Sequence, residues 1–264
     1  YPDMLDRMAQ FELTLLDWAE AHKGDRKYVA FADKCWPAFP EQFGFEPCYV
    51  NSRLASRGIP VSCEVDIYGA LSEYIGACIT GDAVTLLDIN NSVPQYIYDE
   101  DIAGKFDYKL TDTFMGFHCG NTPSCKMCDG CGVKYQLIQH RLLEPAGSEP
   151  DFTRGTLEGD IAASDITFYR LQCDSEGNLR AYVAEGEVLP VATRSFGGIG
   201  IFAIPEMGRF YRHVLIQKRY PHHGAVAFAH CGKVLFEVLK YFGVSDIAYN
   251  QPKSLPYATE NPFC

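Results

Sequence analysis

The sequence lacks the features that would place it in a membrane or on a nucleic acid. It has no run of roughly 18 apolar residues, so no transmembrane helix is expected. Its start shows no basic stretch followed by an apolar one, so no signal peptide is indicated. Lys and Arg total 23 against 34 Asp and Glu, and the net charge of −11 disfavours nucleic acid and anionic membranes as partners. This charge is compatible with a cation as ligand.

The composition is that of an ordinary soluble protein. Apolar residues make up 47% and charged residues 22% of the 264 residues, which is enough for one large or two small domains. The 11 cysteines are an odd number in a chain that is not small, which indicates reduced thiols and a cytoplasmic location. Because the first residue is Tyr1 and not Met, we expect a processed, trimmed or incomplete chain.

The hydrophobic pattern divides the chain into two parts, 1–90 and 91–264. The first part is predicted to be α/β, with a strand–helix–strand order that is typical of parallel βαβ units, at 59–64, 70–79 and 83–88. The second part is predicted to be β-rich from 152 to 204, with bends of a barrel type, and to be closed by a helix at 224–242. Earlier helices are expected at 3–22, 39–45 and 51–58.

Two carboxylates follow the predicted strand at 59–64. Along a strand, alternate side chains point the same way, so Glu64 and Asp66 are expected to share a face. Two anions that close need a metal, a shared proton or a basic partner. The alternative is a helix N-terminus, where acids favour the helix dipole without any chemistry. That alternative remains our interpretation of Glu64, and we reject it for Asp66.

Other groups that could bind a metal lie at the ends of predicted elements. Asp88 and His118 each end a strand, His223 introduces the last long helix, and Glu41 lies on an early helix. Carboxylate and imidazole ligands together suit Mn²⁺, Fe²⁺, Co²⁺ or Zn²⁺. Taken one at a time, each of these residues is better explained as a surface acid or a hydrogen-bonded core histidine.

A run of cysteines gives a sharper local signal. Cys119, Cys125, Cys128 and Cys131 have the short spacings of thiolate clips, and four thiols could close a tetrahedral zinc site. The usual long gap between two clips is absent, and the order of an iron–sulfur motif is incomplete. Loose thiols in a flexible loop are the alternative.

Four motifs in series resemble the L-fucose isomerase family and, more loosely, are similar to L-arabinose isomerase. They cover most of the chain in the order that this family uses, and together they are fairly specific. The motifs are Lys34-Cys35-Trp36-Pro37, Cys63-Glu64-Val65-Asp66 with Gly69-Ala70-Leu71, Phe117-His118-Cys119-Gly120, and His223-Gly224-Ala225-Val226 with His230 and Gly232.

The resemblance implies a metal-dependent aldose–ketose isomerase, with Mn²⁺ as the expected ion and a homo-oligomer as the expected assembly. It implies the metal ligands Asp66 and His223, and a glutamate some two dozen residues before the aspartate, for which Glu41 is near the right spacing. The arabinose isomerase pattern adds His118 and Asp88, and it leaves Glu64 as an alternative ligand to Asp66. Proton transfer between C1 and C2 of the sugar would then use Glu41 and Asp66.

The resemblance also implies a domain arrangement and a substrate contact. The chain looks like the end of a central α/β domain plus a carboxy-terminal barrel domain, without the amino-terminal substrate domain, so we expect weak activity alone. Trp36 could stack on a sugar face, or simply pack in the core. Ala38 stands where relatives can carry an acid. The other functions left open are a non-catalytic sugar-binding or assembly domain and a zinc-stabilised interaction domain.

Overall fold

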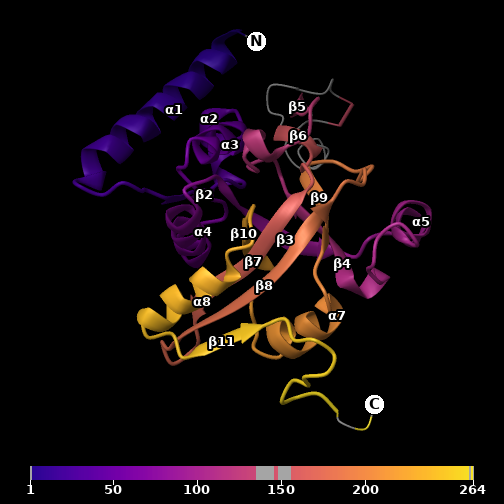
Figure 1. Cartoon of the computed structure of the whole chain (residues 1–264). Helices are drawn as coiled ribbons and strands as arrows, with labels where there is room; N and C mark the ends of the chain where they lie inside the picture. Colours follow the sequence, from indigo (N-terminus) through magenta and orange to yellow (C-terminus); the bar gives the residue numbers. More distant parts are fainter. Residues whose placement is uncertain (1, 135–145, 148–155, 262, 264) are drawn as a thin grey trace.

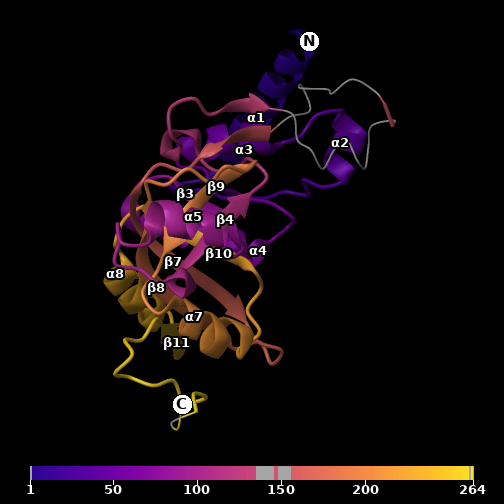
Figure 2. The ribbon, with the colours of Figure 1, turned by 90° about the vertical axis from the view of Figure 1, so that its right-hand side faces the viewer.

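The computed structural model describes residues 2–134, 146–147, 156–261 and 263. A group of helices around a two-stranded sheet forms one end of the molecule, and a nine-stranded sheet forms the rest (Figure 1). The two termini lie at opposite ends of the long axis in both ribbon views (Figures 1 and 2). The mixed α/β class expected from the sequence is confirmed.

The first end of the molecule is built by three helices and two short strands. Its core is apolar, with Phe39, Val50 and Leu54 buried among the helices. Gly44 ends the second helix in the left-handed conformation, as the sequence predicts for a glycine after a helix. The elements are α1 (Pro2–Lys23), β1 (Phe31–Ala32), α2 (Ala38–Phe43), α3 (Cys48–Ser56) and β2 (Val61–Ser62).

The parallel βαβ unit predicted between residues 59 and 88 is wrong in its pairing. Helix α4 (Ile67–Thr80) and strand β3 (Val84–Asn91) form as expected, but β3 does not pair with β2. It runs antiparallel to both β10 and β4 in the large sheet. The parallel pair is instead β1 with β2, joined through α2 and α3. The local hydrophobic pattern predicts whether a segment is a helix or a strand. It does not predict which strands pair, because pairing depends on burial against residues that are distant in the sequence.

The large sheet has the strand order β11-β8-β7-β10-β3-β4-β9-β6-β5. Strand β8 also pairs with β9, so β8, β7, β10, β3, β4 and β9 form a closed ring of hydrogen-bonded pairings. The strands are β4 (Thr113–His118), β5 (Gly132–Lys134), β6 (Thr156–Asp160), β7 (Ser164–Cys173), β8 (Leu179–Leu189), β9 (Gly198–Ala203), β10 (His223–Ala227) and β11 (Asp246–Tyr249). The first residues of the β-rich stretch predicted from 152 lie outside the described residues.

The helix predicted over 224–242 is only half right. Residues His223–Ala227 form β10, a strand buried along its whole length, and the helix α8 begins later, at Gly232, and ends at Tyr241. A strand buried on both faces is a continuous apolar run, which periodicity cannot distinguish from a buried helix. This error matters for the site, because a strand places His223 beside the residues of β3.

Short helical segments connect the remaining strands. Strands β3 and β4 are joined by α5 (Gln95–Ile97), a π-helical segment (Tyr98–Ile102) and a 3-10 turn (Leu110–Asp112). A second 3-10 turn (Ser124–Lys126) follows β4, and α7 (Met207–Phe210) continues as a π-helical segment (Tyr211–Ile216) before β10.

Helix α4 packs closely on the strands β10 and β7. At Gly76 a Cβ atom would come within 1.8 Å of the Tyr169 hydroxyl, so only glycine allows this approach. The Tyr169 hydroxyl donates to the carbonyl of Ser72 (3.0 Å), and the Ser72 hydroxyl accepts from the amide of Leu171 (3.0 Å). These contacts fix the start of α4, and with it Asp66, relative to the sheet.

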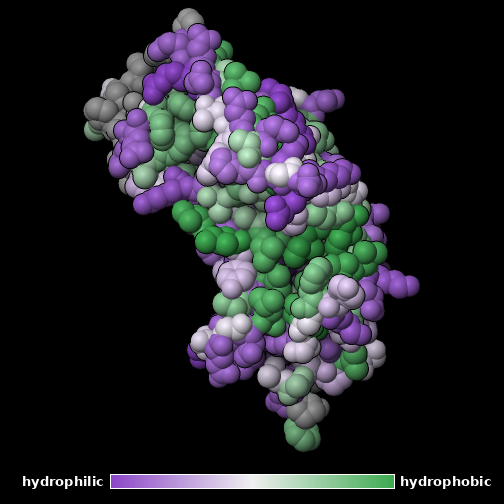
Figure 3. All heavy atoms as spheres, turned by 90° about the vertical axis from the view of Figure 1, so that its left-hand side faces the viewer, coloured by the Kyte–Doolittle hydropathy of each residue, from purple (hydrophilic) through white to green (hydrophobic). Residues whose placement is uncertain are grey.

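The face on which α4 and α8 lie carries a band of apolar side chains (Figure 3). The exposed apolar and aromatic side chains of these elements are Ile67 and Leu71 on α4, and Val234, Tyr241 and Phe242 on or next to α8. Within the described residues, no helix is both long and apolar enough to cross a membrane.

Candidate metal centre

Three neighbouring strands bring the central side chains together. In the antiparallel pairing of β10 with β3, His223 lies directly opposite Asp88. On the other side of β3, Asp88 pairs with Phe117, and His118 is the next residue of β4. Asp88, His118 and His223 therefore converge from consecutive strands, and one ligand atom of each lies within 4.8 Å of the others. All three residues were candidates on the sequence.

Glu64 reaches this cluster through a turn and not through a strand. β2 ends at Ser62, and both Glu64 and Val65 have positive φ angles, of 62° and 56°. The left-handed conformation is strained for a non-glycine residue, most of all for a β-branched one such as Val65, and such strain is often found at functional sites. The turn places the Glu64 carboxylate 3.5 Å from His223 Nε2, with the Glu64 side chain 55% exposed. The expected shared strand face with Asp66 is wrong.

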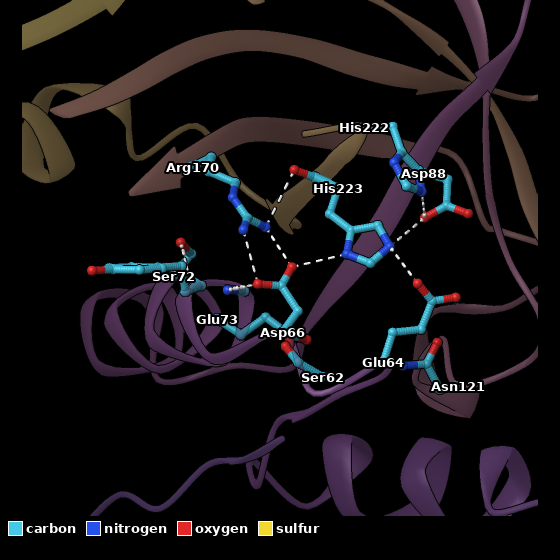
Figure 4. Close-up of polar contacts among 12 residues, drawn as sticks. Ser62, Glu64, Asp66, Ser72, Glu73, Asp88, Asn121, Arg170, His222 and His223 are labelled. Atoms are coloured by element: carbon cyan, nitrogen blue, oxygen red, sulfur yellow. Dashed lines mark hydrogen bonds and ion pairs between the residues drawn. The ribbon is translucent and has the colours of Figure 1, made fainter. Parts of the chain in front are cut away.

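Asp66 has all of its hydrogen-bonding capacity occupied by the protein. Its two oxygens accept from Arg170 Nη1 at 2.6 Å and Nη2 at 2.8 Å, and Oδ2 also accepts from His223 Nδ1 at 2.8 Å (Figure 4). Oδ1 accepts from the amide of Gly69 at 2.8 Å, so Asp66 is the N-cap of α4. Asp66 therefore starts α4, as the helix-start interpretation predicts, and it also binds His223.

The charge of Asp66 is stabilised by these partners. Burial alone would raise the pKa of its carboxyl group, but the hydrogen bonds from His223 and Arg170 outweigh burial and hold the pKa far below its usual range. An ionised carboxylate with so low a pKa is a weak proton acceptor. Its geometry suits a different task, which is to hold the His223 ring in one orientation.

His223 presents its second ring nitrogen to the other acids. Because Nδ1 donates to Asp66, the lone pair of the neutral imidazole is on Nε2, which lies 3.2 Å from Asp88 Oδ1. In the absence of a cation a proton takes that position. Burial lowers the pKa of His223, but the bonds to Asp66 and Asp88 prevail and raise it to about 9. The carboxylate–histidine pair is the arrangement that commonly supports a metal-binding histidine.

Three buried polar atoms lie at the centre of the cluster: Asp88 Oδ1, His118 Nε2 and His223 Nε2. Asp88 and protonated His223 form an ion pair at 3.2 Å, whereas His118 Nε2 has no hydrogen-bond partner among the described residues. Leaving a buried polar atom unpaired costs about 1–3 kcal/mol. A divalent cation would replace the His223 proton between the two ligand atoms, and a water molecule or a ligand hydroxyl group would accept from His118 Nε2. The residues therefore fit a metal ion.

His118 differs from His223 in its tautomer. Its Nδ1 accepts a hydrogen bond from the amide of Cys119 at 2.9 Å, so the proton of the neutral ring is on Nε2. Burial lowers the pKa of His118, which keeps the ring neutral. In this state Nε2 is a hydrogen-bond donor and not a metal ligand. Asp88 is the acceptor at the centre of the cluster. Burial raises the pKa of its carboxyl group, but the hydrogen bond with His223 and the nearby imidazoles have the larger effect, so the pKa is lowered overall.

The remaining predicted residues lie apart from this cluster. Glu41 is exposed on α2, and Trp36 is half-buried in the segment between β1 and α2. Neither belongs to a convergent group of ligand atoms in the described chain. Ala38 is the first residue of α2.

The cysteine run is likewise not gathered into one group. All ten cysteines of the described residues are free, and Cys125 and Cys128 are exposed. None of the convergent groups found among the described residues contains any of the four cysteines from 119 to 131. A zinc site in this run therefore receives no support from the geometry.

Two residues of the site were missed on the sequence. Arg170 is buried in β7 and binds Asp66 through both guanidinium nitrogens, and Glu73 is buried in α4, where it accepts a hydrogen bond from Ser62. Burial raises the pKa of Glu73 to about 8. The available signal was a charge inside an apolar pattern, since Arg and Glu are almost never fully buried without a partner.

The interval between Glu64 and Asp88 is 24 residues, the spacing that the resemblance implied for glutamate and aspartate ligands.

Comparison with known proteins gives the class to which this fold and site belong. The profile of the L-fucose isomerase C-terminal domain matches residues 116–249, slightly more than half of the chain. The chain therefore belongs to the L-fucose isomerase family, as the resemblance of its motifs suggested.

Several curated enzymes are similar to this chain. The chain is 24% identical over 248 residues to a sulfoquinovose isomerase of Alkalicoccus urumqiensis, a match that covers 91% of this chain and 48% of the relative. It is 26% identical over 185 residues to a sulfoquinovose isomerase of Clostridium sp. (strain MSTE9), covering 67% of this chain and 34% of the relative. A third, from Priestia aryabhattai, is 24% identical over 197 residues. The chain thus spans at most about half the length of these relatives.

Proposed function

We propose that this protein is part of a metal-dependent aldose–ketose isomerase and that Glu64, Asp88 and His223 bind its metal. The observation that carries the proposal is the convergence of Asp88, His118 and His223, with one ligand atom of each within 4.8 Å of the others and Asp88 Oδ1 3.2 Å from His223 Nε2. The Glu64 carboxylate, 3.5 Å from His223 Nε2, supplies a third ligand. We also propose that the closed ring of strand pairings is the barrel of the family.

The donor set favours a hard or borderline divalent ion. Two carboxylates and one imidazole suit Mn²⁺, which is our proposed cofactor, and also Fe²⁺, Co²⁺ or Zn²⁺. Such an ion would polarise the sugar oxygens and stabilise the negative charge of the enediolate on the oxygens of C1 and C2. Asp66 keeps the His223 lone pair directed at the ion position by holding the proton on Nδ1.

Proton transfer requires a carboxylate that can reach the sugar. We propose Glu64 in place of Glu41 and Asp66, because its side chain is 55% exposed and lies at the open side of the cluster. We do not assign this role to Asp66, because its pKa is low and four hydrogen bonds occupy its oxygens. His118 Nε2–H is placed to donate a hydrogen bond to a sugar oxygen, which would orient the substrate.

The candidate substrates are aldoses. Sulfoquinovose comes first because three relatives carry its name, and L-fucose and L-arabinose follow from the family. We further propose that the protein acts in the cytoplasm as a homo-oligomer. If the protein is instead a non-catalytic sugar-binding or assembly domain, it should bind sugar without any turnover.

The test is an isomerisation assay with Mn²⁺ and these three aldoses. Because the chain spans about half of its relatives, the assay is run on this chain and on any longer product that contains it. We expect Glu64→Gln to reduce kcat by about 10²–10⁴, the usual contribution of a general base. Glu41→Gln is the matched control and should leave kcat unchanged. Loss of activity in Glu41→Gln with normal activity in Glu64→Gln would reverse the assignment.

A further inference from the structure

A second group of metal-binding side chains lies on the other side of the Glu64 turn. The parallel pairing of β1 with β2 brings the carboxyl ends of both strands together. The amide of Asp33 donates to the carbonyl of Ser62 at 2.9 Å, and the amide of Val65 donates to the carbonyl of Asp33 at 2.8 Å. These bonds hold the segment after β1 against the segment after β2, so Cys35 and Cys63 face each other.

The ligand atoms of this group converge. One carboxylate oxygen of Asp33 and the sulfur atoms of Cys35 and Cys63 all lie within 4.8 Å of one another. Both thiols are buried, with 7% of Cys35 and 1% of Cys63 exposed. Sulfur atoms in a tetrahedral zinc site are about 3.8 Å apart, given Zn–S bonds of about 2.3 Å. Small side-chain rotations are enough to reach that spacing.

The Asp33 carboxylate is oriented into the group but not neutralised. Its Oδ2 accepts a hydrogen bond from Asn51 Nδ2 at 2.7 Å, while its Oδ1 is buried without a hydrogen-bond partner. Among the residues that the structure describes, no lysine or arginine forms an ion pair with Asp33. Burial raises the pKa of this carboxyl group to about 6.

We propose that Asp33, Cys35 and Cys63 form a second, sulfur-rich metal site that binds Zn²⁺. Its two thiolates distinguish it from the oxygen- and nitrogen-rich cluster at Asp88, since soft thiolate ligands select zinc over manganese. The site does not depend on the proposed isomerase activity. A bound ion would fix Cys63, and thereby the strained turn that carries Glu64.

Cobalt absorption tests the site directly, because Co²⁺ bound to thiolate shows a strong near-ultraviolet charge-transfer band that carboxylate and imidazole ligands do not give. The measurement is made on the reduced 264-residue chain that carries His223→Ala, which removes the other cluster. We expect one equivalent of Co²⁺ to give this band and one equivalent of Zn²⁺ to displace it. The same Co²⁺ titration is made on the wild-type chain, where we also expect the band. The test therefore does not depend on how any variant folds.

Variants then assign the ligands. Cys35→Ser and Cys63→Ser should each weaken Zn²⁺ binding at least tenfold, and Asp33→Asn should weaken it without removing the band. Cys78→Ser, at an exposed thiol of α4, is the matched control and should change nothing. The double variant Cys125→Ser/Cys128→Ser removes the competing cysteine run and should also bind normally.

Three results would overturn the proposal. The first is a cobalt spectrum without a thiolate band in the wild-type chain. The second is zinc binding that survives loss of both Cys35 and Cys63. The third is zinc binding that disappears in Cys125→Ser/Cys128→Ser, which would restore the site predicted from the cysteine run.

Discussion

At the scale of single residues, the site depends on which nitrogen of each histidine carries a proton. The acceptor for His223 Nδ1 is a carboxylate, and the donor to His118 Nδ1 is a backbone amide, so the neutral forms of the two imidazoles are opposite tautomers. Once His223 loses its Nε2 proton, its ring offers a lone pair to the cluster, whereas the His118 ring offers a proton. Two histidines that look equivalent in the sequence have different capacities in the folded chain.

Replacing Asp66 tests the role of the acid that holds His223. Asp66→Asn keeps the size of the side chain but removes the charge that pairs with Arg170 and fixes the His223 ring. We expect Mn²⁺ affinity to fall by about 10–100-fold, as is usual when a partner behind a metal ligand is removed. Isothermal titration calorimetry measures the affinity, and Asp82→Asn, at a more exposed acid paired with Lys126, is the control.

The same variant distinguishes a supporting acid from a metal ligand. If Asp66 were itself a ligand, Mn²⁺ binding would be abolished and not merely weakened. Arg170 would remain buried without its partner, so a lower free energy of unfolding is expected in either case and does not discriminate.

The pH dependence of metal binding follows from His223. Its pKa of about 9 means that the metal-free protein carries a proton on Nε2 at neutral pH, and a metal must displace that proton. Affinity should therefore rise about tenfold per pH unit between pH 6 and 8, because the deprotonated fraction rises by that factor. Mn²⁺ titrations at several pH values check the slope. A flat profile would contradict the assigned proton position.

At the scale of elements, one strained turn and one buried strand build the site. Strand β10 sets His223 opposite Asp88, and the Glu64–Val65 turn brings a third acid to them. Both features were hidden from the sequence. Residues 223–227 are an apolar run without a period, and left-handed residues at 64 and 65 have no signal such as glycine or asparagine.

Relieving the backbone strain at the Glu64–Val65 turn should stabilise the protein. Val65 is β-branched and 47% exposed, and it adopts a φ of 56°. Val65→Asn should raise the free energy of unfolding by about 1 kcal/mol, because asparagine tolerates the left-handed conformation and little burial is lost. Denaturant unfolding measures the change. Val234→Asn, at an exposed position in α8, should give no gain, and an equal gain in both variants would refute the explanation.

At the scale of the whole molecule, the proposed ligands come from its two ends. Glu64 follows the small sheet, whereas Asp88 and His223 belong to the large one, and α4 bridges them by packing Gly76 against Tyr169. The sequence predicted most elements and named Asp88, His118 and His223 as candidates, because residue types and local hydrophobic periodicity can be read directly from it. It could not assign Asp66, because its partner Arg170 lies 104 residues away in the chain.

The central claim is that His223, and not a neighbouring histidine, completes a metal site with Asp88 and Glu64. The most direct measurement is Mn²⁺ binding to the wild-type chain, His223→Ala and His222→Ala, since the adjacent His222 is 59% exposed and lies 3.8 Å from Asp88. We expect His223→Ala to lose more than about 100-fold in Mn²⁺ affinity, beyond the loss caused by removing a supporting partner, and His222→Ala to bind normally. Normal binding by His223→Ala, or an equal loss in both variants, would contradict the central claim.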